Sequence, residues 1–265
     1  MLLLLTLISF LPLALAANLY VAPTTVNISQ PGDVIILRGV LHVERIHYWN
    51  FRRLTFTHGP YGYYVKDSGN LRFNQIVTRD NYESGFHMQG ALSSNVISYL
   101  DSYGNRDPRN SGENADGIAI KEGKGEGNIV VGSRFWDNPY IGVDFWEFHS
   151  KLIIKDSFAR GNGYNRWNLA NFTGNGNGFK LGGGSAVDIL LAGREVVDCI
   201  AFGYRANGFT DNSWDSPAPL LTKQSFRSVD AGLVAGARNK NGKIAASDFL
   251  VLADGARRGA TTAWK

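Results

Sequence analysis

Short apolar runs, separated by Gly, Asn and Asp, recur along the 265-residue chain from about residue 20 onward. The runs are rich in β-branched and aromatic residues, and apolar residues at helical spacing are almost absent, which is typical of short strands. The first run, residues 33–39 (DVIILRG), follows a Pro-Gly pair. The pattern therefore predicts an all-β chain.

Five segments of the chain align with one another. Each has an apolar strand, a small residue and a second short strand, and four of the five end in Asn. The ends of the segments, at positions 81, 105, 138, 162 and 204, differ by 24, 33, 24 and 42. A Gly followed by an apolar residue recurs after each segment. These pairs begin at Gly85, Gly117, Gly142, Gly178 and Gly208.

A basic period of 24 with two longer intervals predicts a parallel β-helix, a single-domain solenoid with three short strands in each coil. Backbone pairing stacks successive coils about 4.8 Å apart. The terminal Asn residues are then expected to form ladders and turns and not to be catalytic. Cys199 aligns with Ser133 and Ser157 and is expected to be a packed interior thiol.

The two longer intervals predict loops on the solenoid, one between Asn105 and Asn128 and one between Asn162 and Gly178. Loops on a rigid scaffold tend to carry the functional site. The repeat is less legible near the C-terminus, so residues 225–265 are expected to form a degenerate last coil and a C-terminal cap.

The N-terminal residues 1–16 are predicted to be a signal peptide, because an apolar stretch ends in the small-x-small sequence Ala14-Leu15-Ala16. A basic n-region is missing, so an uncleaved anchor is the alternative interpretation. Residues 17–265 are then the β-helix domain of a secreted, extracellular protein. Sequons at Asn27 and Asn171 are compatible with this and predict a glycoprotein.

The net charge of +4 favours an acidic partner. Lys and Arg form no clustered run and no later segment is apolar enough to cross a membrane, so an acidic polysaccharide fits better than nucleic acid or a membrane. A monomer is expected. Cys199 is the single cysteine, which excludes an intramolecular disulfide, so a large core or a regular hydrogen-bonded scaffold must hold the chain together.

The candidate chemistry centres on residues 174–184 (GNGNGFKLGGG), a Gly-rich run with one lysine, Lys180. Glycines allow a ligand or a second backbone to approach closely, and lysine is suited to act as a base. Lys180 and Asp144 each stand two residues after a repeated Gly, so they are expected at the same position in neighbouring coils, with Asp116 one coil further back. This set predicts an acid/base and metal constellation, although a solvated salt bridge explains Lys180 and Asp144 equally well.

At this point the chain resembles the family 9 polysaccharide lyases. The resemblance extends from about residue 43 to residue 208, in order and at family spacing, with a weaker echo at 248–255. It rests on five motifs: 114–117 (NADG) followed by Lys121, 125–128 (GEGN), 142–146 (GVDFW), 161–165 (GNGYN) and 176–183 (GNGFKLGG).

The resemblance implies a pectate lyase with a right-handed parallel β-helix, which cleaves polygalacturonate, or pectin, by calcium-assisted β-elimination. Lys180 matches the family's base, and Asp116 and Asp144 match two of its calcium ligands. Lys121, Arg166 and Arg205 are expected to pair with uronate carboxylates. Four aromatic residues are candidates either for stacking on sugars or for packing within the coils: Trp136, Trp146, Trp167 and Tyr164.

The chain departs from the family at Tyr140 and Ile141, where the resemblance places two further acidic ligands. Calcium normally takes about 6–8 oxygen ligands, so the site is expected to be weak or to be completed by the substrate's carboxylate. Asp137 and Glu147 are other candidates to contribute.

Three hypotheses follow. The first is a secreted pectate lyase-like enzyme. The second is a non-catalytic polyuronate-binding β-helix with a degraded calcium site. The third is a glycoside hydrolase that uses Asp116 and Asp144 as a carboxylate pair, which leaves the lysine and the Gly-rich motif unexplained.

Overall fold

The computed structural model describes residues 20–21, 35–184, 193–210 and 230–248. The predicted signal peptide and the sequon at Asn27 lie outside these residues. Asn171, the acceptor of the second sequon, is exposed. No helix in the described ranges is both long enough and apolar enough to span a bilayer.

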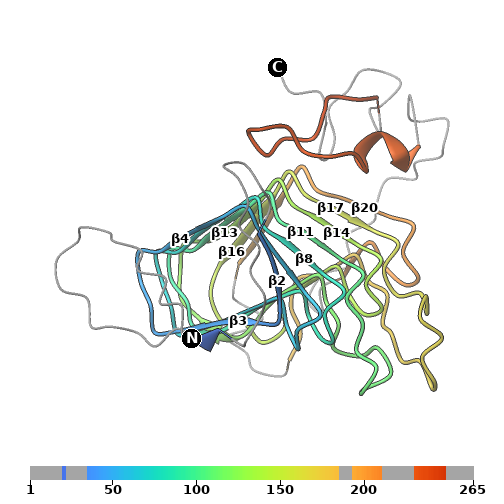
Figure 1. The fold of residues 1–265 in the computed structure, drawn as a ribbon, viewed down its shortest axis with the longest axis horizontal. Coiled ribbons are helices and arrows are strands. Elements are labelled where there is room, and N and C mark those ends of the chain that lie inside the picture. Colours follow the sequence, from blue (N-terminus) through green and yellow to red (C-terminus); the bar gives the residue numbers. More distant parts are fainter. Residues whose placement is uncertain (1–19, 22–34, 185–192, 211–229, 249–265) are drawn as a thin grey trace.

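Three sheets run along the molecule and enclose one core, and each coil contributes one strand to each sheet in turn (Figure 1). Sheet neighbours are therefore one coil apart in the chain, and among the strands of the described residues every pair is parallel except β1 with β3. The predicted all-β parallel β-helix is confirmed.

The eight-stranded sheet contains β1 (Tyr20–Val21), β3 (Leu41–Glu44), β6 (Tyr63–Lys66), β9 (Phe86–Ala91), β12 (Ile118–Lys124), β15 (Val143–Asp144), β18 (Phe179–Lys180) and β21 (Phe209–Thr210). The six-stranded sheet contains β4 (Asn50–Arg52), β7 (Arg72–Asn74), β10 (Val96–Ser98), β13 (Asn128–Val131), β16 (Leu152–Lys155) and β19 (Arg194–Val197). The seven-stranded sheet contains β2 (Ile35–Arg38), β5 (Leu54–Thr57), β8 (Val77–Arg79), β11 (Asp101–Tyr103), β14 (Arg134–Trp136), β17 (Phe158–Arg160) and β20 (Ile200–Phe202).

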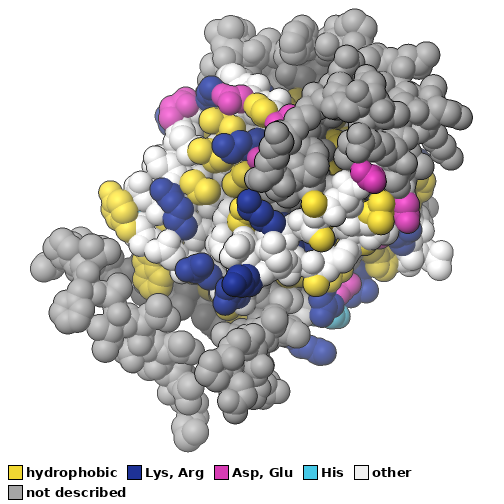
Figure 2. Space-filling view, turned by 90° about the horizontal axis from the view of Figure 1, so that it is seen from above, with side chains coloured by type: hydrophobic (Ala, Val, Ile, Leu, Met, Phe, Trp, Pro, Cys, Tyr) yellow, Lys and Arg dark blue, Asp and Glu magenta, His cyan; other side chains and the backbone are white. Residues whose placement is uncertain are grey.

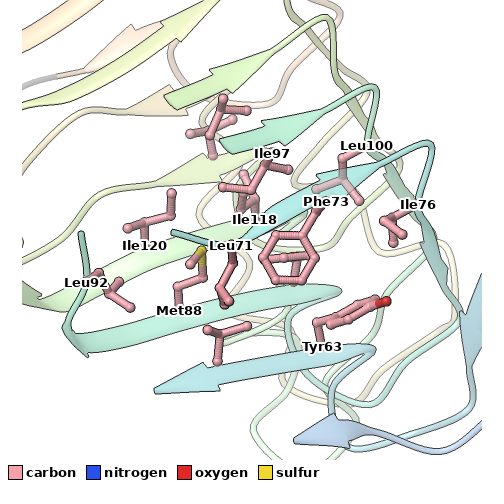
Figure 3. Close-up of a cluster of buried hydrophobic side chains, with 14 of the residues drawn as sticks. Tyr63, Leu71, Phe73, Ile76, Met88, Leu92, Ile97, Leu100, Ile118 and Ile120 are labelled. Carbon is pink, nitrogen blue, oxygen red and sulfur yellow. The ribbon is translucent and has the colours of Figure 1, made fainter. Parts of the chain in front are cut away.

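Apolar side chains stack in lines inside the solenoid, because alternate strand residues point inward and the register repeats from coil to coil. In the six-stranded sheet Phe73, Ile97, Val130 and Ile154 are successive partners, and all are buried. Figure 3 shows ten labelled core residues, Phe73 and Ile97 among them, gathered between the sheets. Each such side chain contributes roughly 1.5–3 kcal/mol when fully buried.

A ladder of asparagines crosses four coils at one corner of the solenoid. The Nδ2 atoms of Asn81, Asn105 and Asn138 donate to the Oδ1 atoms of Asn105, Asn138 and Asn162, at 2.9, 2.9 and 3.2 Å. All four residues are buried. Each acceptor Oδ1 also accepts from the backbone N–H of the preceding Asn. The ladder therefore gives hydrogen-bond partners both to the backbone at the corners and to its own side chains. The predicted structural role of these residues is confirmed.

Cys199 lies in a second line of small polar residues. The side chains of Ser133, Ser157 and Cys199 each donate to the carbonyl oxygen two residues earlier. Burial raises the pKa of the Cys199 thiol to about 12, which keeps it protonated and unreactive. Cys199 is half-buried and packs against the core, so the predicted packing is confirmed, although the thiol is not fully interior.

The described part of the C-terminal segment, residues 230–248, begins with the 3₁₀ helix η2 (Ala231–Val234). It lies along the outside of the seven-stranded sheet and not across an end of the solenoid (Figure 1). Asp101 in β11 holds it in place, because both Arg134 of β14 and Arg238 of the segment pair with this carboxylate, at 2.6 and 2.7 Å. Arg134 also donates to the carbonyl oxygen of Val234. The remainder of 225–265 is outside the described residues.

Candidate active site

The site lies on the outer face of the eight-stranded sheet, where β15 and β18 pair. Asp144 is the register partner of Lys180, and Lys180 Nζ lies 3.4 Å from Asp144 Oδ1. Val143 and Phe179, the preceding residues, are fully buried in the core, so alternation turns the Asp144 and Lys180 side chains outward. The sequence prediction that these two residues occupy equivalent positions in neighbouring coils is confirmed.

Lys121 joins both aspartates. Its Nζ lies 3.4 Å from Asp116 Oδ2 and 3.5 Å from Asp144 Oδ2. The pairing of β12 with β9 is irregular between Ile120 and Gly123, and Lys121 falls within this bulge. Its position allows one ammonium group to contact carboxylates from two coils.

Asp116 is fully buried just before β12. Ser84 Oγ lies 3.2 Å from Asp116 Oδ2, while Asp116 Oδ1 has no hydrogen-bond partner among the described residues. Burial raises the pKa of Asp116 to about 7, although the positive charge of Lys121 opposes this shift. Burial disfavours the charged form of Lys121, but Asp116 and Asp144 outweigh it and raise the pKa of Lys121 above its ordinary value.

The lysines, and not the aspartates, reach the surface of this cluster. The side chains of Asp116 and Asp144 are 0% and 2% exposed, whereas those of Lys121 and Lys180 are 13% and 18% exposed. Lys180 Nζ also lies 5.8 Å from the centre of the Trp146 ring. The cluster therefore presents two ammonium groups above two buried carboxylates, which suits an anionic ligand.

The two predicted loops meet beside this cluster. Residues 104–117 connect β11 to β12, residues 161–178 connect β17 to β18, and Thr173 of the second loop donates its backbone N–H to the Ser111 carbonyl oxygen at 3.0 Å. Gly112 (φ +92°) lies against the Phe172 ring, where a Cβ would come within 2.8 Å of the ring. Buried Asp107 accepts hydrogen bonds from Asn110 and Asn114 and so fixes the first loop just before Asp116.

The donors around Asp116 and Asp144 do not fit calcium. Ile141 is fully buried and has no oxygen in its side chain, and Asp137 forms an ion pair with Arg166 at 3.0 Å. Within the described ranges no three His, Cys, Asp or Glu side chains gather as metal ligands would. Two carboxylates, both already in contact with ammonium groups, fall short of the about 6–8 oxygens that calcium takes.

The three predicted substrate-binding cations are only partly brought together. Lys121 belongs to the cluster, but Arg166 pairs with Asp137, and Arg205 donates to the carbonyl oxygen of Gly174 at 2.7 Å. Both arginines are exposed near the second loop, and no described contact joins either one to Lys180.

The aromatic candidates have separate surroundings. Trp136 stacks on Tyr103 with ring centres 4.2 Å apart, Trp146 lies next to Lys180, and the Tyr164 hydroxyl reaches the carbonyl oxygen of Tyr204 at 3.3 Å. Trp167 is half-buried. Only Trp146 therefore contacts the lysine–aspartate cluster among these four.

An aromatic row continues the outward line of Asp144 and Lys180 towards the N-terminus. His42, Tyr64, His87 and Ala119 are successive register partners, followed by Asp144. The rings of Tyr64 and His87 are stacked with centres 5.3 Å apart, and His42 meets Tyr64 edge-on at 4.7 Å. His42 and Tyr64 are partly exposed whereas His87 is buried, so the first two are the rings of this row that could contact a sugar polymer.

The sequence analysis did not identify Ser84, Asp107 or His87. Ser84 stands directly before a repeated Gly, as Asp116 does. His87 stands two residues after a repeated Gly, as Lys180 does. The Gly-apolar repeat therefore carried a signal for Ser84 and His87. Asp107 lies in a loop outside the repeat and had none.

Figure 2 looks at the molecule from above the view of Figure 1, which is the side away from β3 and the eight-stranded sheet. On this side Lys and Arg side chains are scattered between hydrophobic side chains, and this view does not show the lysine–aspartate cluster.

Fold and site define a parallel β-helix protein with a lysine–carboxylate cluster on its eight-stranded sheet. The model of the Pel9A-like, right handed beta helix region matches residues 23–239. The chain belongs to this family, and the resemblance to family 9 polysaccharide lyases and the right-handed β-helix are confirmed.

Two relatives are informative. Pectate lyase PEL9 of Emericella nidulans is 42% identical over 86% of this chain and 72% of its own length. Pectate lyase L of Dickeya dadantii is 35% identical over 68% of this chain and 41% of its own length.

Two solved structures share the fold. Pectate lyase Pel9A superposes with a TM-score of 0.67 and 22% identity, over 86% of this chain and 82% of that one. A rhamnogalacturonan lyase gives a TM-score of 0.60 and 19% identity, over 85% and 78%.

Proposed function

We propose that this protein is a secreted polysaccharide lyase that cleaves polygalacturonate by β-elimination, with Lys180 as the base. The observation that carries the proposal is the paired position of Lys180 and Asp144 on the outer face of the eight-stranded sheet, with Lys121 beside them. Relatives named pectate lyase support the class of reaction and the substrate.

In this reaction the neutral amine of Lys180 takes the proton from C5 of a uronate residue. The electrons of the C5–H bond form a double bond between C4 and C5, the C4–O4 bond breaks, and O4 leaves with its electron pair and takes a proton from water. Asp144 orients the Lys180 side chain through the 3.4 Å contact. An amine accepts a proton only when it is neutral, so the rate is expected to rise towards alkaline pH.

Calcium stays a prediction of the family resemblance. No step above passes through it, because the described donors do not fit the ion. A hydrolase that uses Asp116 and Asp144 directly is disfavoured, since both carboxylates are buried beneath the lysines.

The replacement Lys180→Met tests the base. Loss of a general base is expected to slow formation of the unsaturated uronide, followed by its ultraviolet absorbance, by roughly 10²–10⁴-fold. Lys155→Met is the matched control, because Lys155 is an exposed lysine at the end of β16. Equal rates in the two variants would show that Lys180 is not the base.

A non-catalytic polyuronate-binding protein is the second candidate, favoured by Tyr140 and Ile141 at positions where the family has acidic ligands. It predicts that the wild-type protein is retained on pectate gels and yields no unsaturated product at any pH or with any divalent ion. We also propose that the protein is secreted, is a monomer and is glycosylated at Asn27 and Asn171, whichever of the two functions it has. Mass spectrometry and gel filtration of the protein recovered from a culture medium test them.

A further inference from the structure

The charges of the cluster are balanced without a metal ion. Asp144 has both oxygens in contact with ammonium groups, Oδ1 with Lys180 and Oδ2 with Lys121. The Oδ2 atom of Asp116 contacts Lys121 as well. When both lysines are protonated, two carboxylates face two ammonium groups, and a divalent ion added to this resting cluster would leave an uncompensated positive charge in a buried place, which is costly.

The register explains why the further ligands are missing. Ile141 precedes Gly142 as Asp116 precedes Gly117, so Ile141 takes the position of Asp116 in the next coil, where its side chain is fully buried. Beside it, the Tyr140 hydroxyl is hydrogen-bonded to Asn175, and burial raises the pKa of Tyr140, so it stays a neutral phenol. An isoleucine and a neutral tyrosine supply no negative charge to hold a cation.

Lys121 lies where the two aspartates converge. It contacts one oxygen of each at 3.4 and 3.5 Å, and 13% of its side chain remains exposed. An ammonium group has three N–H bonds. Two are used by Asp116 and Asp144, which leaves the third for an anion that reaches the exposed side.

We propose that the Lys121 ammonium group, and not calcium, is the cation that binds the carboxylate of the uronate whose C5 proton Lys180 removes. The inference rests on the proposed function and deepens it. Proton removal from C5 moves negative charge onto that carboxylate, and a hydrogen-bonded ammonium group in a site shielded from water stabilises this charge. Lys121 is thus a catalytic residue, and elimination proceeds without a divalent ion.

The first arm of the test compares the rate of wild-type protein on polygalacturonate with added calcium and with excess EDTA. The rates are expected to agree within about twofold, because the cation is part of the chain. A rate that collapses in EDTA and returns with calcium would overturn the proposal.

The second arm replaces the cation. Lys121→Met is expected to lower kcat/KM by about 10²-fold or more, the usual cost of losing one group that stabilises the transition state. Lys124→Met is the matched control, since Lys124 is an exposed lysine of the same strand. Equal activity of the two variants would overturn the proposal. Circular dichroism shows whether Lys121→Met folds. If it does not, Lys121→Arg replaces it, because this variant keeps the positive charge. Lys121→Arg is expected to retain more activity than Lys180→Met, and an equal loss of activity in these two variants would count against the proposal.

The third arm does not use activity. Thermal unfolding of wild-type protein and of Asp144→Asn is measured over a calcium titration. We expect calcium to leave the Tm of both proteins unchanged. A rise of Tm that saturates with calcium, is reversed by EDTA and occurs in the wild-type protein alone would contradict the proposal. Absence of product in every arm of the activity assay would instead reject the proposed function, and the calcium titration would still decide whether these aspartates hold the ion.

Discussion

At the residue scale, the chemistry depends on side chains whose charges are set by close neighbours. Asp144 and Lys180 were predictable, because both stand two residues after a repeated Gly and strand pairing converts that position into contact. Pairing of Lys121 with a uronate carboxylate was expected from the family resemblance, but its contact with both aspartates was not predictable, because that contact depends on an irregular pairing of β12 that lets one side chain reach two coils. Sequence spacing indicates register, but it does not show where the register is interrupted.

His87, in the aromatic row, provides a pH prediction. Burial, reinforced by the positive charge of Lys121, lowers the pKa of His87 to about 4. In the unfolded chain this imidazole takes a proton near its ordinary pKa of about 6.5, so the folded state loses stability as the pH falls from about 6.5 to 4. Each unit of difference between the folded and unfolded pKa changes the free energy of unfolding by about 1.4 kcal/mol, so the folded state loses about 3 kcal/mol of stability.

His87→Phe keeps an aromatic ring against Tyr64 and removes the titration. The free energy of unfolding, measured by urea denaturation at pH 7.5 and 4.5, is expected to fall by about 2–3 kcal/mol more in wild-type protein than in the variant. The control is His58→Phe, at an exposed histidine, which should keep the wild-type pH dependence. An unchanged pH dependence in His87→Phe would contradict the neutral, buried state of His87.

At the element scale, the corners of the coils matter as much as the strands. The repeat of terminal Asn residues was readable in the sequence, and its meaning followed from the stacking of coils. The two insertions were readable as well, although their contact through Ser111 and Thr173 was not, because nothing in the repeat fixes the path of a loop.

Asn138, near the middle of the asparagine ladder, tests this element. It donates to Asn162 and accepts from both the backbone and side chain of Asn105 while fully buried. Asn138→Ala leaves these groups without partners and is expected to cost about 2–4 kcal/mol of unfolding free energy in urea denaturation. Asn50→Ala, at an exposed strand position in β4, should change it by less than about 0.5 kcal/mol. Similar values for the two would argue against a stabilising ladder.

At the scale of the whole molecule, the solenoid and the C-terminal segment form one unit through a buried charge cluster. The β-helix itself followed from the period of 24, but the path of residues 230–248 did not, since it depends on Arg238 finding a carboxylate 137 positions earlier in the chain. Long-range ion pairs of this kind have no periodic signature.

Asp101 is the centre of that cluster. Burial alone would raise the pKa of this carboxyl group, but Arg134 and Arg238 outweigh burial and hold it below its ordinary value. Its contribution to stability is therefore present above the ordinary pKa of about 3.8 and is lost on further acidification.

Asp101→Asn leaves two buried guanidinium groups without their anion and is expected to cost about 3–5 kcal/mol. Limited proteolysis with mass spectrometry should then show faster cleavage within 230–248 at neutral pH. Asp80→Asn is the control, because the Asp80–Arg79 pair is about one-third exposed and contributes little. Equal cleavage in both variants would mean that Asp101 does not hold the segment.

The pairing of β15 with β18 has one more consequence. The step from Asp144 to Lys180 is one coil, about 4.8 Å, and it is set by the backbone. Duplication of a whole coil elsewhere in the gene would therefore lengthen the outer face by one such step and leave the reactive pair unaltered. If the proposed function holds, the length of polymer that the outer face can contact can change in evolution without any change in the pair that carries the chemistry.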